Sequence, residues 1–121
     1  MTVEELQELE IIDEKKLEDM IYTIRGQKVM LDFELAKLYG YTTSAFNQQV
    51  QRNVNKFPPD FRFRISKAES EYLSISQNVT AIMQIIGAKG GRTSFPYAFT
   101  EQGVYMLMTV LRGELAVKQN N

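Results

Sequence analysis

Apolar residues recur at helical spacing on both sides of Gly40, and this pattern predicts two short helices joined by a tight glycine turn. The first helix begins at Asp32, whose side chain can cap it, and bears a stripe of three leucines: Leu31, Leu35 and Leu38. The second begins near Thr42 or Thr43 and bears an apolar stripe of its own: Phe46, Val50 and Val54. Two amphipathic helices in this order have the layout of a helix-turn-helix.

The opposite face of the second helix is polar and contains no carboxylate. At about 100° per residue it gathers five side chains: Ser44, Gln48, Gln51, Arg52 and Asn55. A solvated helix face usually mixes Glu with Lys, whereas amides, hydroxyls and guanidinium groups suit base edges and phosphates. The pattern favours a helix that reads DNA, but an ordinary helical hairpin with an uncharged surface gives the same pattern, and both interpretations stay open at this point.

A hairpin is predicted directly before this helical pair. Two apolar runs within residues 21–31 flank Gly26-Gln27, which suits a two-residue type II′ turn. The tip then presents Arg25 and Lys28 side by side. These two cations can hold the phosphate backbone, or they can be charges that keep a hairpin soluble.

A strand is predicted after the helical pair, at residues 61–65, where aromatic and basic residues alternate. This alternation places Arg62 and Arg64 together on the outward face. Two arginines on one strand can neutralise adjacent phosphates, and a half-buried strand with a solvated face is the alternative.

The C-terminal half is expected to contain a helix at 66–76, a strand at 95–99 and a helix from Thr100 or Glu101. Ser66 and Glu69 have the spacing of a capping box for the first of these helices. Because the last helix is apolar nearly all round from residue 104 to residue 111, we expect it to be buried, with a dimer contact as the alternative.

Composition excludes several classes of function. The chain has no cysteine and no histidine, so it lacks the favoured zinc ligands, thiolate chemistry and the commonest general base. Its carboxylates are scattered rather than clustered, so no magnesium site and no enzyme activity are expected. No secretory or membrane-spanning stretch is present, and we expect a cytoplasmic protein without a membrane partner.

Charge is distributed unevenly along the 121 residues. Residues 1–20 contain eight acids and two lysines, a net charge of −6, whereas residues 21–121 contain twelve Lys or Arg and seven Asp or Glu, a net charge of +5. Such asymmetry is a hint of a nucleic-acid-binding body with an acidic appendage. We expect an acidic amphipathic leader helix at 1–20, one domain at 21–117, and at 118–121 the start of a linker to a further domain.

Four sequence blocks resemble a known family. They are IRGQKVMLDFELAKLYGY, FNQQVQRN, FPPDFRF and, after a spacer, FPYAFTEQGV. In this order they resemble the KilA-N-related "ORF six N" family, phage and viral domains found at the N-termini of antirepressor-like proteins, over about residues 21–115. The resemblance implies a small α+β domain that binds DNA and precedes a separate C-terminal domain.

The resemblance also singles out motif residues on the second helix. Asn53 falls on the apolar side and Gln49 on its flank, so we expect both to satisfy buried polar groups rather than to touch bases. Asn47 lies near the helix start, where recognition helices often meet bases, and is a candidate reader.

We therefore expect a small single α+β domain with a helix-turn-helix-like pair, short antiparallel strands and a buried C-terminal helix. Its expected function is sequence-specific binding of double-stranded DNA, without a cofactor, in a phage-derived antirepressor or transcriptional regulator. The expected base-reading residues are Ser44, Asn47, Gln48, Gln51 and Arg52. The expected phosphate-binding residues are Arg25, Lys28, Thr43, Lys56, Arg62, Arg64, Lys67 and Arg92. A non-enzymatic protein-interaction or dimerisation module is the alternative, with a second copy or a repressor protein as partner.

Overall fold

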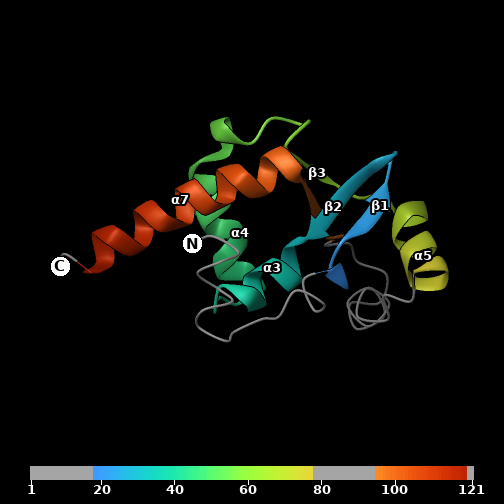
Figure 1. The fold of residues 1–121 in the computed structure, drawn as a ribbon, viewed down its shortest axis with the longest axis horizontal. Coiled ribbons are helices and arrows are strands. Elements are labelled where there is room, and N and C mark those ends of the chain that lie inside the picture. The colour runs from blue at the N-terminus through green and yellow to red at the C-terminus, as the bar shows by residue number, and fades with distance from the viewer. Residues whose placement is uncertain (1–17, 78–94, 120–121) are drawn as a thin grey trace.

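The computed structural model describes residues 18–77 and 95–119, with side chains in the last helix described as far as Leu111. Within these ranges the chain forms four α-helices and a four-stranded antiparallel sheet, which confirms the predicted α+β class (Figure 1). The strands are β1 (Tyr22–Ile24), β2 (Gln27–Leu31), β3 (Arg62–Arg64) and β4 (Tyr97–Thr100). The helices are α3 (Asp32–Leu38), α4 (Thr43–Arg52), α5 (Lys67–Ser76) and α7 (Glu101–Gln119), with a 3-10 turn η1 (Val54–Lys56). None of these helices is long and apolar enough to cross a membrane.

The sheet has the strand order β1-β2-β4-β3, and helices cover both of its faces. Met30 and Phe99 pair across β2 and β4 and pack into a core with residues of α3, α4 and α7. Ile24, Val29 and Ala98 belong to a second core, which Leu73 of α5 closes. Figure 1 accordingly shows α5 on the far side of the hairpin from α4 and α7.

The predicted helical pair is present around Gly40. Gly40 has a positive φ of 78°, which lets the chain turn sharply after α3, and the Thr42 hydroxyl then caps α4 by accepting a hydrogen bond from the backbone N–H of Ala45. Phe46 and Val50 are completely buried, as their spacing predicts.

Two details of this pair differ from the prediction. Asp32 is the first residue of α3 rather than its cap, because the cap position is Leu31 and the Asp32 carboxylate bonds elsewhere. Val54 is 45% exposed, because α4 ends at Arg52 and the 3-10 turn that follows rotates Val54 off the apolar stripe.

The hairpin turn lies one residue earlier than predicted. Ile24 pairs with Gln27, so the central turn residues are Arg25 and Gly26, both with positive φ (55° and 72°). This is the type I′ combination, whose twist matches the twist of the flanking strands. The prediction of a Gly26-Gln27 type II′ turn is therefore wrong, and Lys28 now stands opposite Thr23 rather than beside Arg25.

The C-terminal elements follow the prediction in position but not entirely in burial. The capping box of Ser66 and Glu69 is formed, with both reciprocal hydrogen bonds. Helix α7, however, is buried along one stripe that includes Leu107 and Leu111, whereas Tyr105 is 62% exposed. An all-apolar sequence does not bury this helix all round, because the sheet and α4 contact one side of it. The expected leader helix lies outside the described residues apart from positions 18–20, and so do residues 78–94 of the spacer before the fourth sequence block.

Candidate nucleic-acid interface

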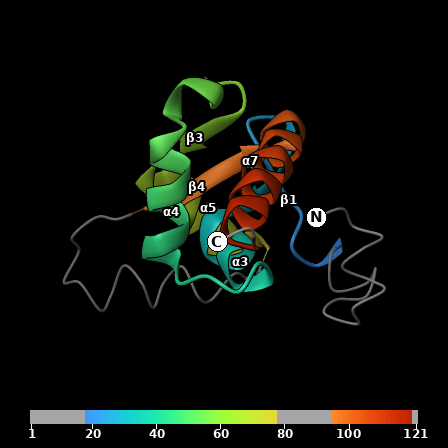
Figure 2. The same ribbon diagram turned by 90° about the vertical axis from the view of Figure 1, so that its left-hand side faces the viewer.

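The outer side of α4 is a continuous polar surface. Its exposed side chains are Thr43, Ser44, Gln48, Gln51 and Arg52, and Asn55 extends the surface into η1. Seen from the end of the molecule, α4 lies along one margin with α7 on its inner side (Figure 2). Since α4 contains no acidic residue, this surface offers hydroxyl, amide and guanidinium groups without a carboxylate to repel phosphate. The exposure of four predicted base readers, Ser44, Gln48, Gln51 and Arg52, agrees with the angular count from sequence.

Two arginines of β3 lie on the same side of the sheet as α4. Arg62 pairs with Phe99 and Arg64 with Tyr97, so both arginines project from the sheet face on which α4 packs. Their guanidinium carbons lie 4.1 and 4.3 Å from the centroid of the Tyr97 ring. Such stacking holds two like charges in fixed places with few rotamers free.

The two arginines differ in exposure, which corrects one prediction. Arg64 is exposed, as expected, but Arg62 is only 9% exposed. Alternation along β3 correctly places both side chains on one face, but that face is covered by helices rather than facing solvent. Burial also lowers the pKa of the Arg62 guanidinium. Because so little of its side chain is exposed and its guanidinium lies on the Tyr97 ring, Arg62 supports the stack rather than contacting phosphate.

A buried carboxylate joins α3, α4 and β4. Asp32 Oδ2 accepts a hydrogen bond from Asn47 Nδ2 of α4 (2.9 Å) and another from the backbone N–H of Tyr97 (3.2 Å). Burial raises the pKa of Asp32, while these bonds and one from the Phe33 backbone oppose the shift. The junction fixes α4 relative to the strand that carries the tyrosine of the stack.

Asn47 therefore lies in a different setting from the other predicted readers. It is half-buried, its amide nitrogen is committed to Asp32, and its Oδ1 is buried without a partner among the described residues. Sequence reasoning missed Asp32 and Tyr97 as members of this junction. The available signal was the polar Asn47 at the border of an apolar stripe, which had to bond to something beneath it.

The far end of α4 is anchored through the loop to β3. Asn53 Nδ2 donates to the backbone oxygen of Gln49 (3.1 Å), as expected for a residue that satisfies buried polar groups. The Gln49 side-chain oxygen is buried, with no partner in the described part of the chain. Further along, Thr100 Oγ1 donates to the carbonyls of Asp60 (2.8 Å) and Phe61 (3.2 Å), which ties this loop to the start of α7. Lys56, exposed in η1, is held between these two anchors.

The remaining predicted phosphate contacts do not gather around α4. Arg25 forms a two-pronged ion pair with Glu69 of α5 (2.8 and 3.0 Å) and lies over the Phe63 ring. This pairing raises the pKa of Arg25 and lowers that of Glu69. Lys67 opens α5, on the opposite side of the sheet from α4, and Lys28 is exposed on the hairpin. Arg92 lies outside the described residues.

Metal chemistry gains no support from the geometry. Among residues 18–77 and 95–119, the acidic side chains form no group of three that could hold an ion. The arrangement around α4 instead supplies neutral hydrogen-bonding groups flanked by fixed cations, which is the chemistry that nucleic acid accepts.

Comparison with known proteins adds one match. The model of the ORF6N domain family matches residues 19–110, about three quarters of the chain. No curated protein and no solved structure matches the chain.

Proposed function

This chain belongs to the ORF6N domain family, and on that premise we propose that it binds double-stranded DNA sequence-specifically, as part of a phage-derived antirepressor or transcriptional regulator. Family membership itself carries the coarser conclusion, a phage-type regulatory domain. The finer proposal depends on the surface of α4. We also propose that the domain acts by binding alone, without enzymatic chemistry or a cofactor.

The observation that carries the proposal is an acid-free helix surface flanked by two immobilised arginines. Gln48 and Gln51 are exposed one turn apart along the middle of α4, and a glutamine amide can bond to adenine in the major groove with two hydrogen bonds. Arg52 suits guanine or a phosphate, and Ser44 lies at the helix start, where recognition helices commonly approach bases.

Phosphate contacts in this proposal come from two cations and one hydroxyl group near α4. Arg64 is exposed at the edge of the stack, and Lys56 and Thr43 are exposed at the two ends of the helix. Arg62 supports Arg64 through Tyr97 rather than reaching DNA itself. We give Asn47 a positioning role, because its bond to Asp32 sets the rotation of α4 about its axis.

The test is retention of random-sequence duplex DNA by the domain at several salt concentrations, followed by sequencing of the retained DNA. The proposal predicts an enriched motif. Replacement of Gln48 by Ala should weaken binding by about 1 to 3 kcal/mol and relax one position of the motif. Arg64→Ala should weaken all sequences alike and reduce the salt slope by about one, whereas the matched control Lys67→Ala on α5 should do neither. Equal effects of Arg64→Ala and Lys67→Ala would contradict the assignment of the surface.

The alternative is a protein-interaction or dimerisation module that binds a repressor or a second copy. It predicts partner binding without any retention of DNA at low salt. One structural feature, on the side of the molecule away from α4, gives protein binding a specific location, and it does not compete with the DNA surface.

A further inference from the structure

Among the strands that the structure describes, β1 lies at the edge of the sheet, and one of its residues is already hydrogen-bonded as if a further strand lay beside it. Because Ile24 and Gln27 flank a two-residue turn, Ile24 bonds to β2, and the backbone N–H and C=O of the preceding Thr23 point outward. Both are occupied by the side-chain amide of Gln77, where α5 ends: Thr23 N–H donates to Gln77 Oε1, and Gln77 Nε2 donates to Thr23 O, each at 3.3 Å.

A primary amide that both accepts from the N–H and donates to the C=O of one residue makes the same two-point contact as the opposing residue of an antiparallel strand, which offers its own C=O and N–H. Gln77 therefore shows which kind of molecule fits this edge. Its two bonds are long and lie at the surface, so a backbone with better geometry can displace them at little cost.

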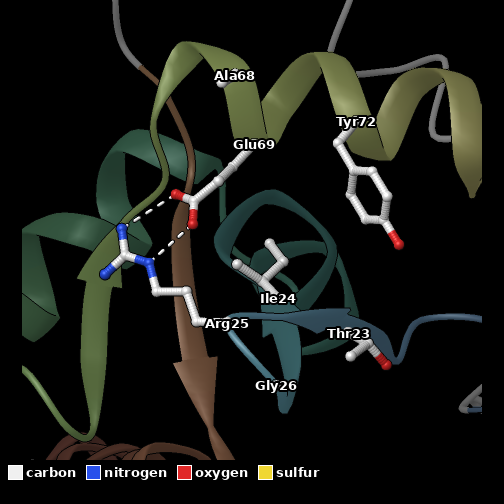
Figure 3. Close-up of a pocket in the computed structure, with 7 residues that line it drawn as sticks. All are labelled: Thr23, Ile24, Arg25, Gly26, Ala68, Glu69 and Tyr72. Atoms are coloured by element: carbon white, nitrogen blue, oxygen red, sulfur yellow. Dashed lines mark hydrogen bonds and ion pairs between the residues drawn. The ribbon is translucent and has the colours of Figure 1, made fainter.

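An open pocket of about 330 Å³ lies beside the same edge, between β1 and α5 (Figure 3). Ile24 lies in the middle of this pocket, and Ala68 and Tyr72 line it from α5. On the side of the turn the pocket is lined by Gly26, which has no side chain to fill it. At one end Arg25 and Glu69 bond to each other, so their charges are mutually satisfied. The pocket therefore suits an uncharged apolar side chain.

The edge and the pocket are in register with each other. In an antiparallel pair, the residue opposite Thr23 takes both of its hydrogen bonds, and the neighbours of that residue point to the sheet face that holds Ile24. That face is the one that α5 covers, so a neighbouring side chain of the added strand enters the pocket.

We propose that the groove between β1 and α5 binds an extended peptide segment of a partner protein, which adds a strand to the β1 edge and places an uncharged apolar side chain in the pocket beside Ile24. Main-chain hydrogen bonds to Thr23 supply a sequence-independent part of the affinity, and the pocket supplies the preference. The groove lies on the opposite side of the sheet from α4, so this inference is independent of DNA binding.

The experiment is selection of a phage-displayed library of random dodecapeptides on the whole chain, followed by affinity measurement and amide chemical-shift mapping with the synthetic peptides obtained. Three variants test the mechanism. Thr23→Pro removes the outward N–H, which an edge strand tolerates. Gln77→Ala removes the competing amide. Ala68→Phe fills the pocket, and Glu71→Phe, at an exposed position of α5 that does not line the pocket, is its matched control.

Selected peptides should share an apolar residue and shift the amide signals of β1 and α5. Their affinity should fall about 2- to 10-fold with Thr23→Pro and rise by a similar factor with Gln77→Ala, because one ordinary hydrogen bond is lost in the first variant and one competitor is removed in the second. Ala68→Phe should abolish binding and Glu71→Phe should not, a comparison that still decides the matter if Thr23→Pro fails to fold. Selection without enrichment, shifts confined to other elements, or equal effects of the two phenylalanine variants would overturn the proposal, as would self-association of the chain through β1.

Discussion

Gly103 is the position at which the structure predicts the largest effect of a single methyl group. It lies in the first turn of α7, directly against the backbone of the loop that leads into β3. A Cβ atom at this position would lie 1.9 Å from the carbonyl oxygen of Phe61 and 2.9 Å from its carbon, whereas ordinary contacts begin near 3.4 Å. Because the obstructing atoms belong to the backbone, no side-chain rotation relieves the contact, and α7 and the loop must separate by more than 1 Å.

The cost of Gly103→Ala follows from what this separation disturbs. Overpacking of this kind costs about 1–3 kcal/mol. The Phe61 carbonyl also accepts hydrogen bonds from the backbone and the hydroxyl of Thr100, and their weakening adds about 1 kcal/mol each. Alanine regains roughly 1 kcal/mol of helix propensity. The net loss of about 2–4 kcal/mol is a large part of the 5–15 kcal/mol typical of a small domain.

Urea denaturation followed by circular dichroism measures this loss. We expect the midpoint of Gly103→Ala to fall by on the order of 1 M with an unchanged slope, and its Tm to fall by at least about 8 °C. Gln102→Ala, the exposed neighbour in the same helical turn, should leave both nearly unchanged. A loss below about 0.5 kcal/mol in Gly103→Ala would refute the close approach of α7 to this loop.

Three further predictions concern α4 and its supports. Burial raises the pKa of Asp32, so the folded state binds its proton more tightly than the unfolded state does. The free energy of unfolding should therefore fall as pH rises from the ordinary value of 3.8 through the raised pKa. Asp32→Asn should make this decline smaller, as measured by urea midpoints across the pH range. Thr42→Ala should destabilise the domain by about 1 kcal/mol through loss of the α4 cap, whereas Thr43→Ala, one residue on and exposed, should change the urea midpoint little. Tyr97→Leu should free both arginines from the stack. The free energy of DNA binding, measured by fluorescence anisotropy, should then change by more than the free energy of unfolding does. A change in the free energy of unfolding alone would mean that the ring serves packing only.

Local patterns predicted the elements well where a single segment contains the whole signal. The stripe of Phe46 and Val50 fixes which side of α4 is buried, and the polar side follows from the helical angle alone. The capping box of Ser66 and Glu69 is likewise contained within four residues, and it marks the start of α5 correctly.

Features that depend on distant segments could not be predicted in this way. Alternation shows that Arg62 and Arg64 share a face, but which face carries the helices depends on the pairing of β3 with β4, whose residues lie far along the chain. The bond between Asp32 and the Tyr97 backbone joins residues 65 positions apart, and no local pattern records it. The hairpin turn shifted by one residue because tertiary burial of Tyr22 and Ile24, rather than the glycine alone, fixes the register.

The claim that the outer face of α4 contacts DNA can be tested most directly with a single reactive site. The chain has no cysteine, so Gln48→Cys and Glu71→Cys each create one thiol, the first on the outer face of α4 and the second on α5 across the sheet. Each variant would carry a thiol-linked DNA-cleaving reagent and be mixed with duplex DNA at low salt. We predict strand cleavage by the Gln48→Cys conjugate and little or none by the Glu71→Cys conjugate. Equal cleavage by the two, or cleavage from α5 alone, would contradict the account.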